Sequence, residues 1–146
     1  MRANLIRNPD LVQAVLEEVF ETIREDNSPH PSTVDLTGTP VIAMSSEEGV
    51  HGIIAIQPFG LNASHLALAI RPEFYGHSDN IELTRRGIQL CANLTRNPKF
   101  IMTIPVEDKE KLRFAQRVGF RREGIIRNSF LRNEKMIDQY LVGVSI

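Results

Sequence analysis

The chain has 146 residues, of which 42% are hydrophobic and 24% are charged, and its formal net charge is −1 at pH 7. This length fits a single domain over residues 1–146, and this composition is ordinary for a folded globular protein. Dedicated nucleic-acid-binding domains usually carry an excess of basic residues, which this chain lacks. We therefore expect one globular domain whose partners do not include nucleic acid.

The sequence also argues against the disulfide-bonded, metal-binding and membrane-spanning classes. Its one cysteine, Cys91, lies in an apolar helical pattern and has no second cysteine to pair with. The four histidines lack the spacing of metal ligands. No apolar run approaches the ~18 residues of a membrane span, and the first residues do not resemble a signal peptide. We expect a soluble cytoplasmic protein with no metal and no membrane partner.

In chain order, the first expected elements are a short strand over residues 3–7 and an amphipathic helix. Asn8 followed by Pro9 is typical of a helix start, and apolar residues then recur at helical spacing to about Arg24. The glutamates of this helix lie mostly off the apolar stripe, which predicts a solvated face. Residues 27–39 are rich in proline, serine and threonine and predict a long loop.

The middle of the chain predicts an antiparallel meander followed by a crossover. The expected elements are strands over residues 41–44, 50–57, 64–71 and 100–104, and a helix over residues 81–94. Asp79 and Glu82 have the spacing of a capping box at the start of this helix. A strand–helix–strand crossover after a meander predicts a mixed sheet in an α/β domain.

The C-terminal part predicts a helix, a strand, a tight turn and a strand. Asp108 can cap the helix, and Leu112, Ala115 and Val118 fall on one of its faces. Gly119 follows, where a left-handed cap needs a residue without Cβ. Apolar and β-branched residues on both sides of a polar turn at residues 132–135 then predict an antiparallel hairpin.

Two groups of residues carry a resemblance to a known family. They are Ile70, Pro72, Glu73, Phe74 and Gly76 in the middle of the chain, and Gly119, Phe120, Glu123, Gly124, Arg127, Asn133, Glu134 and Asp138 near its end. In order and spacing they resemble the GNAT superfamily of acetyl-CoA-dependent N-acetyltransferases, and most of all the branch that acetylates ribosomal-protein N-termini. The resemblance implies a mixed, largely antiparallel sheet of about six to seven strands with flanking helices.

The resemblance also implies where acetyl-CoA, as co-substrate, would bind. A tight loop that opens a helix offers backbone N–H groups to the CoA pyrophosphate, and the third strand of the meander, near a bulge, offers an N–H to the thioester carbonyl. The implied cofactor-binding residues are Leu68, Ile70, Arg71, Gly76, His77, Ser78, Asp79, Asn80 and Asp108.

This loop departs from the family pattern at Tyr75, Ser78 and Asn80, and Asp79 adds a negative charge where two phosphates would lie. Two interpretations of Asp79 stay open: it is a harmless helix cap, or it is a sign that nucleotide binding has been lost. One like-charge contact at ~4 Å costs about 4 kcal/mol at an effective dielectric constant of about 20.

The familiar proton-transfer groups of the branch are replaced as well, by Thr103 at the position of the base and Ala115 at the position of the acid. His65 and Tyr75 are the substitute catalytic candidates. Strand alternation puts His65 on a face with two alanines, where an imidazole suits proton transfer. The alternative is that His65 is a strand-edge or hydrogen-bonded core histidine.

Two functions follow. The first is an N-acetyltransferase that moves acetyl from acetyl-CoA to a primary amine, on a small molecule or at a protein N-terminus, by direct attack on the thioester. The second is a catalytically degenerate GNAT-fold protein that acts as a binding or structural module. The exposed edge of the C-terminal hairpin is a place where a homodimer could form.

Overall fold

A computed structural model describes the whole chain except residues 1, 7 and 34–37. Residue 7 was expected in the first strand and residues 34–37 in the long loop, so these parts of the expectations lie outside the described residues. The strands are β1 (Arg2–Ile6), β2 (Val41–Ser46), β3 (Gly49–Phe59), β4 (Ala63–Ile70), β5 (Lys99–Pro105), β6 (Arg121–Arg132) and β7 (Lys135–Ser145). The helices are α1 (Pro9–Ile23), α2 (Ser78–Thr95) and α3 (Lys109–Val118), with short 3₁₀ turns η1 (Pro31–Thr33) and η2 (Pro72–Phe74).

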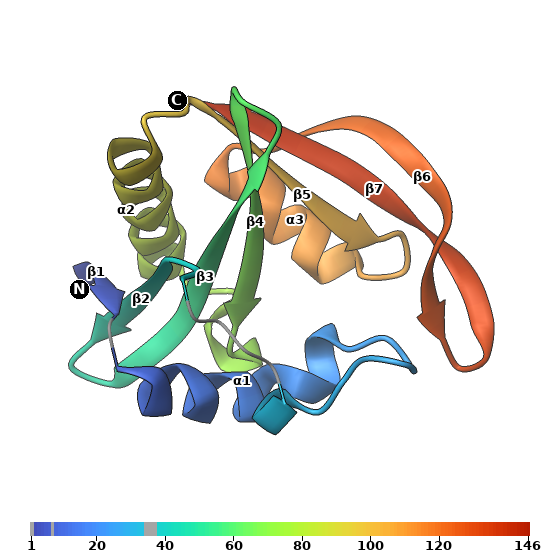
Figure 1. Cartoon of the computed structure of the whole chain (residues 1–146), viewed down its shortest axis with the longest axis horizontal. Helices are drawn as coiled ribbons and strands as arrows, with labels where there is room; N and C mark the ends of the chain where they lie inside the picture. The colour runs from blue at the N-terminus through green and yellow to red at the C-terminus, as the bar shows by residue number, and fades with distance from the viewer. Residues whose placement is uncertain (1, 7, 34–37) are drawn as a thin grey trace.

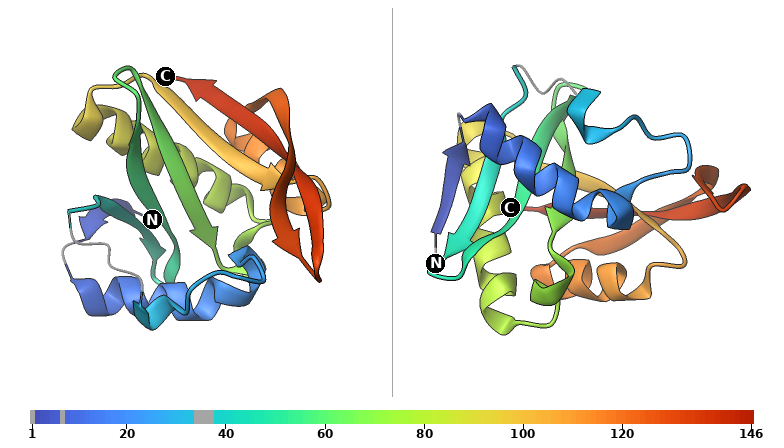
Figure 2. Two further views of the ribbon diagram at one scale, coloured as in Figure 1. Left: turned by 45° about the vertical axis from the view of Figure 1, so that its right-hand side comes forward. Right: turned by 90° about the horizontal axis from the view of Figure 1, so that it is seen from below.

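The strands form one seven-stranded sheet in the order β1-β2-β3-β4-β5-β7-β6 (Figure 1). All neighbouring pairs are antiparallel except β4 and β5, which are parallel and are connected through α2. This arrangement confirms the expected mixed, largely antiparallel sheet and its crossover. In Figure 2, α1 lies on one face of the sheet and α2 and α3 lie on the other.

Helix α1 begins where the sequence indicates. Asn8 is its N-cap, and the Asn8 side chain accepts a hydrogen bond of 3.0 Å from the Asp10 N–H. The apolar stripe of the helix then packs on the sheet, where Val15 and Val19 are buried together with Ile53 of β3. This small core holds α1 against β2, β3 and β4.

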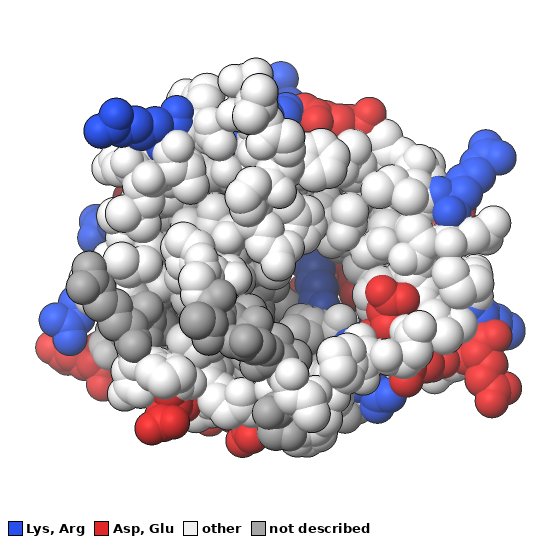
Figure 3. Space-filling model, in the orientation of Figure 1, with Lys and Arg blue, Asp and Glu red and all other residues white. Residues whose placement is uncertain are grey.

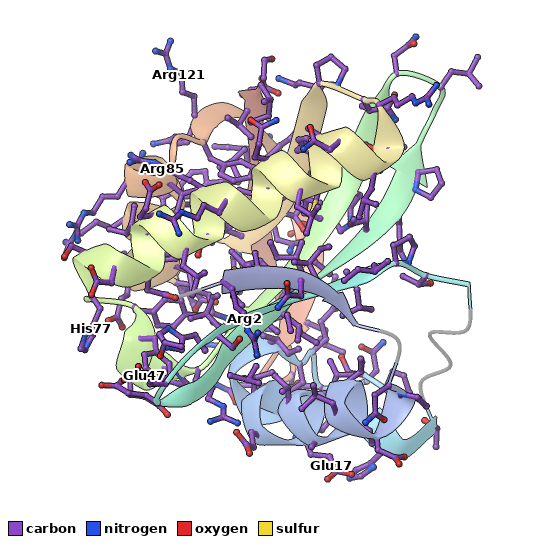
Figure 4. The ribbon with its side chains drawn as sticks, turned by 90° about the vertical axis from the view of Figure 1, so that its left-hand side faces the viewer. Arg2, Glu17, Glu47, His77, Arg85 and Arg121 are labelled. Atoms are coloured by element: carbon purple, nitrogen blue, oxygen red, sulfur yellow. The ribbon has the colours of Figure 1, made fainter. Side chains whose placement is uncertain are left out.

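The main core lies on the opposite face, between the sheet and the two other helices. Residues from five strands and both helices share it, including Ile54, Leu83, Phe100 and Phe114. The Arg85 guanidinium of α2 also caps the C-terminus of α3, because it donates to the carbonyls of residues 117 and 118 at 2.7 and 3.1 Å (Figure 4). Helices α2 and α3 are therefore fixed to each other by packing and by hydrogen bonds.

The expected capping box at the start of α2 is wrong. The helix begins at Ser78, and its N-cap is His77, whose side chain makes no capping hydrogen bond. Because the helix begins at Ser78, Asp79 is already its second residue. Glu82 instead lies 3.5 Å from Arg86, one helical turn later. The interpretation of Asp79 as a helix cap is therefore not supported.

Strands β4 and β5 separate along their length, and this separation positions the candidate site. They pair only where residues 63–65 of β4 lie beside residues 99–101 of β5, and they then diverge (Figure 1). The β3–β4 pairing is regular from one end of β4 to the other, so the bulge expected near residues 68–70 is not found in it. The opening in the sheet arises from the splay of β4 away from β5 instead.

Strand β6 forms the far edge of the sheet, and residues 121–128 are exposed, Ile125 with 52% of its surface. The homodimer expected at this edge stays a prediction. No helix in the described part of the chain is long and apolar enough to cross a membrane.

Candidate active site

A cavity of about 490 Å³ lies at the splay between β4 and β5. Phe20 and Ile23 of α1 line it on one side of the sheet, and Tyr75 and Phe114 line it on the other. Residues of β4 and β5 form its middle. Figure 3 shows a hollow on this face of the molecule with Lys or Arg atoms at its base. The cavity is thus lined from both faces of the sheet, at the place where the sheet opens.

A backbone N–H group of β4 points into this opening. The Arg71 N–H donates to the His51 carbonyl at 2.9 Å, so these two residues form a hydrogen-bonded pair at the end of the β3–β4 ladder. Hydrogen-bonded pairs alternate in an antiparallel ladder, which directs the N–H groups of Leu68 and Ile70 away from β3 and toward β5. Since β5 pairs with β4 only as far as His65, the N–H group of Leu68, which lines the cavity, faces the opening. Ile70 is fully buried and does not line the cavity.

His65 lies on the α1 side of the opening, as the alternation of β4 predicts. Ala69 belongs to the small core under α1, whereas Leu66 and Ile70 belong to the main core on the other face. His65 lines the cavity, and burial lowers the pKa of its imidazole below the ordinary 6.5. At pH 7 this imidazole is neutral and can accept a proton.

Tyr75 lies across the sheet from His65 and also lines the cavity. Its ring meets the Phe114 ring edge to face, with 5.5 Å between the centroids. Burial, followed by the charges of Asp108 and Glu110, raises the pKa of the Tyr75 hydroxyl to about 12. The two predicted catalytic candidates therefore reach the same cavity from opposite faces of the sheet.

A charged cluster on α3 borders the same cavity. Asp108 is the N-cap residue, as expected, but its side chain makes no capping bond. Arg132 of β6 donates two hydrogen bonds to the Asp108 carboxylate, at 2.7 and 3.1 Å, and the Lys111 ammonium lies 3.6 Å from that carboxylate. Lys111 lines the cavity, and burial lowers the pKa of its ammonium.

Sequence reasoning missed Lys111. A local signal did exist, because Lys111 shares a helix face with Phe114 and Ala115, at spacings of three and four residues. Thr103 and Ala115, which the resemblance assigns to the positions of the base and the acid, also line the cavity.

The start of α2 forms the candidate phosphate loop. The N–H groups of Ser78 and Asp79 have no acceptor within the helix, because a first helical turn provides none. The Asn80 N–H is already used, since it donates to the His77 carbonyl at 3.1 Å. A Cβ built on Gly76 meets no atom within 4 Å, so this part of the loop is open to close approach. The loop therefore fits an anionic group. His77 lies at the start of the helix (Figure 4).

Two predicted loop residues are engaged within the protein. Arg71 forms an ion pair of 2.5 Å with Glu18, so its charge is directed toward α1. The Asn80 side chain is fully buried, and its Nδ2 donates to the Phe74 carbonyl at 3.0 Å. Asn80 Oδ1 then accepts from Nδ1 of His51 at 3.3 Å. With Nδ1 as the donor, Nε2 of His51 accepts from the Ser46 hydroxyl at 2.6 Å.

This chain of hydrogen bonds fixes the candidate phosphate loop to β2 and β3. The His51 ring also stacks on the Phe74 ring, with 3.8 Å between centroids and 4° between planes. Both ring nitrogens of His51 and both amide atoms of the Asn80 side chain have hydrogen-bond partners, as a low-dielectric interior requires. The loop is thus held on a rigid base.

The loop after α1 closes the cavity on the side of the C-terminal hairpin. The Glu25 carboxylate accepts from the Leu131 N–H at 2.9 Å, although Glu25 was expected to lie on a solvated face. The Asp26 carboxylate accepts from the N–H groups of Asn133 and Glu134 at 3.0 and 2.7 Å. Both turn residues have positive φ, 51° and 62°, and the carboxylate stabilises this conformation. Among the described residues, no group of three His, Cys, Asp or Glu side chains is placed to hold a metal ion.

A scan of the sequence against protein-family models finds no match, and a search among curated proteins finds no relative. Solved structures do match over almost the whole chain. The structure of spermidine N-acetyltransferase from Vibrio cholerae in complex with CoA and spermine has a TM-score of 0.72 at 14% identity and covers 98% of this chain and 94% of its own. An acetyltransferase (GNAT family) from Bacillus anthracis has a TM-score of 0.73 at 13% identity, with coverages of 99% and 95%.

A chimera of spermidine N-acetyltransferase SpeG from Vibrio cholerae and hSSAT has a TM-score of 0.76 at 13% identity and covers 99% of this chain and 96% of its own. The chain has the GNAT fold. The expected fold class is thereby confirmed. At these identities the likeness establishes the fold alone.

Proposed function

We propose that this GNAT-fold protein is an N-acetyltransferase that moves the acetyl group of acetyl-CoA to a primary amine by direct attack on the thioester. The observation that carries the proposal is the cavity at the splay between β4 and β5, which Leu68 lines with its N–H directed away from β3. Hydrogen-bond donors placed where a carbonyl oxygen gains negative charge are a large source of acyl-transfer catalysis.

The residues present fit acetyl-CoA in two places. The cavity of about 490 Å³ lies within the usual range of about 300–1,000 Å³ for small-molecule sites. The candidate phosphate loop offers the N–H groups of Ser78 and Asp79 beside the open Gly76. We propose that this loop holds the pyrophosphate and that the thioester lies in the opening, with His65 on the α1 side to take a proton from the attacking amine.

For the acceptor, we propose a primary amine on a small molecule. The bonds from Glu25 and Asp26 to the C-terminal hairpin close the cavity on one side, which favours a small acceptor over a folded protein surface. The matching structures include spermidine N-acetyltransferases, whose acceptor is a small amine. The resemblance to the ribosomal-protein branch makes a protein N-terminus the second acceptor class to test.

The first experiment is a calorimetric titration of the purified protein with acetyl-CoA. We expect micromolar affinity, which corresponds to about −8 kcal/mol, followed by turnover in a screen of small amines and N-terminal peptides. Gly76→Asp should abolish both because it adds a charge beside the phosphates, whereas Gly76→Ala should bind normally because the position is open. No heat at millimolar acetyl-CoA would refute the proposal.

One observation favours a second candidate, a GNAT-fold binding or structural module without catalysis. The exposed Asp79 is in the first turn of α2, beside the N–H groups that would hold the phosphates. A like-charge contact there costs about 4 kcal/mol at ~4 Å and an effective dielectric constant of about 20, before the side chain rotates into solvent. Detection of acetylated amine above a no-enzyme control would refute this candidate.

A further inference from the structure

Attack of an amine on a thioester requires two proton transfers, one to the departing thiolate and one from the attacking nitrogen. A C–N bond forms and a C–S bond breaks, the sulfur departs with the bonding electron pair as a thiolate, and the attacking nitrogen must lose a proton. In the cavity, His65 is placed on the α1 side of the sheet to take the proton from the attacking nitrogen. The thiolate departs on the opposite side of the carbonyl and needs its own partner there.

We propose that Lys111 is the catalytic acid of this reaction, with an ammonium that lies against the thioester sulfur and gives a proton to the departing thiolate. This inference rests on the proposed function. Lys111 then becomes a neutral amine, the thiolate becomes the thiol of CoA, and the proton released by the acceptor nitrogen restores the ammonium through solvent. No oxidant, metal or other reactant is needed.

The geometry that supports the proposal is the position of Lys111 on the far wall of the opening. Its side chain has 23% of its surface exposed and lines the cavity together with Phe114, one turn further along α3. Leu68 of β4, whose N–H points into the opening, lines the same cavity. The Lys111 ammonium and the Leu68 N–H therefore face one space, while His65 reaches it from the other side of the sheet.

The neighbours of Lys111 keep it charged and in place. The Asp108 carboxylate lies 3.6 Å from the ammonium, and two hydrogen bonds from Arg132 fix that carboxylate. Asp108 favours the charged form of Lys111, whereas burial and Arg132 favour the neutral form, and burial is the largest effect. Asp108 and Arg132 are thus positioning residues, and the ammonium they hold gives up its proton more easily than an exposed lysine does.

Tyr75 is the other donor on this side, and the structure favours Lys111 over it. A proton donor is most effective when its pKa is near that of the group it protonates, and thiols ionise at about 8.5. The Tyr75 hydroxyl has a pKa of about 12 because of burial and the charge of Asp108, which moves it away from that value. Burial moves the pKa of Lys111 toward it. Tyr75 is better suited to shape the wall of the cavity.

The test compares acyl donors whose leaving thiols differ in acidity. Lys111→Met removes the ammonium, and Lys109→Met is the matched control, on the same helix but exposed. With acetyl-CoA we expect Lys111→Met to lower kcat by roughly 10²-fold, the lower end of the usual range for general acid catalysis. With an acetyl thioester of a more acidic aryl thiol, the loss should shrink to less than about tenfold, because such a thiolate departs without a proton.

Four results decide the matter. An equal loss of kcat with both acyl donors would overturn the proposal, since it would indicate a structural role. Turnover of Lys111→Met equal to that of Lys109→Met would also overturn it. An acetyl group on Lys111, found by mass spectrometry of the intact enzyme after turnover, would also overturn it by making this residue a nucleophile. If the unaltered protein acetylates no amine, the proposed function itself fails and this inference fails with it. Calorimetry of acetyl-CoA binding should give the same Kd for both variants, so that a lost site is distinguished from a lost proton donor.

Discussion

Replacement of Asn80 by alanine tests whether the buried polar chain supports the candidate phosphate loop. The change removes the bond from Nδ2 to the Phe74 carbonyl, 3.0 Å, and the bond from Nδ1 of His51 to Oδ1, 3.3 Å. Each buried hydrogen bond contributes about 1 kcal/mol, and a buried donor left without a partner costs about 1–3 kcal/mol. We expect the free energy of unfolding to fall by about 2–4 kcal/mol.

Urea unfolding of the Asn80→Ala variant measures this loss. At about 3 °C per kcal/mol for a chain of this size, the melting temperature should fall by roughly 6–12 °C. Asn93→Ala is the control on the same helix, because Asn93 is exposed and its side chain bonds only to the Gln89 side chain in the described structure. Its change should stay within about 0.5 kcal/mol.

The loop makes a second readout possible. If the hydrogen bonds that connect Ser46, His51 and Asn80 hold the loop, acetyl-CoA binding should weaken in Asn80→Ala. It should stay unchanged in Asn93→Ala, at a temperature where both variants are folded. Equal stability of the two variants would refute the reasoning about the buried bonds. A destabilised Asn80→Ala with unchanged acetyl-CoA affinity would refute the link to the loop.

Three further predictions concern packing, charge and reactivity. Gly52→Ala should lower the free energy of unfolding by about 2 kcal/mol in a denaturant titration, because its Cβ would lie 2.4 Å from the Ala69 carbonyl oxygen, whereas the exposed Gly124→Ala should change it by less than about 0.5 kcal/mol. Asp79→Asn should tighten acetyl-CoA binding by about fivefold in calorimetry at low salt, and Asp10→Asn, the same change in the first turn of α1, should have no effect. Burial raises the pKa of the Cys91 thiol to about 12, so alkylation at pH 8 should follow the rate of global unfolding; fast modification of the native protein would contradict this.

The sequence alone predicts the elements whose signals are local. Asn8 and Pro9 mark the start of α1, and Gly119 follows the last residue of α3 with φ of 129°. The alternation in β4 also predicts correctly that His65 faces the α1 side. In each case the signal is a cap or a periodicity within one element, which the rest of the fold does not change.

Contacts between distant parts of the chain could not be predicted in this way. The splay of β4 from β5 is a property of two strands separated by a helix, and it creates the opening that the N–H group of Leu68 faces. The Asp108 side chain was expected to cap the helix, but its carboxylate instead accepts a hydrogen bond from Arg132, 24 residues further on. Lys111 becomes significant only through this pair and the cavity beside it.

The bonds between the end of α1 and the C-terminal hairpin determine when the site can exist during synthesis. Glu25 and Asp26 accept hydrogen bonds from residues 106 to 108 positions later, in the C-terminal hairpin, which is synthesised long after α1. Contacts at such separations form late, because closing a long loop costs entropy before any contact compensates for it. The nascent chain can therefore bury most of its core while the cavity still lacks a wall. We expect ligand binding to appear only after the hairpin of β6 and β7 has been synthesised.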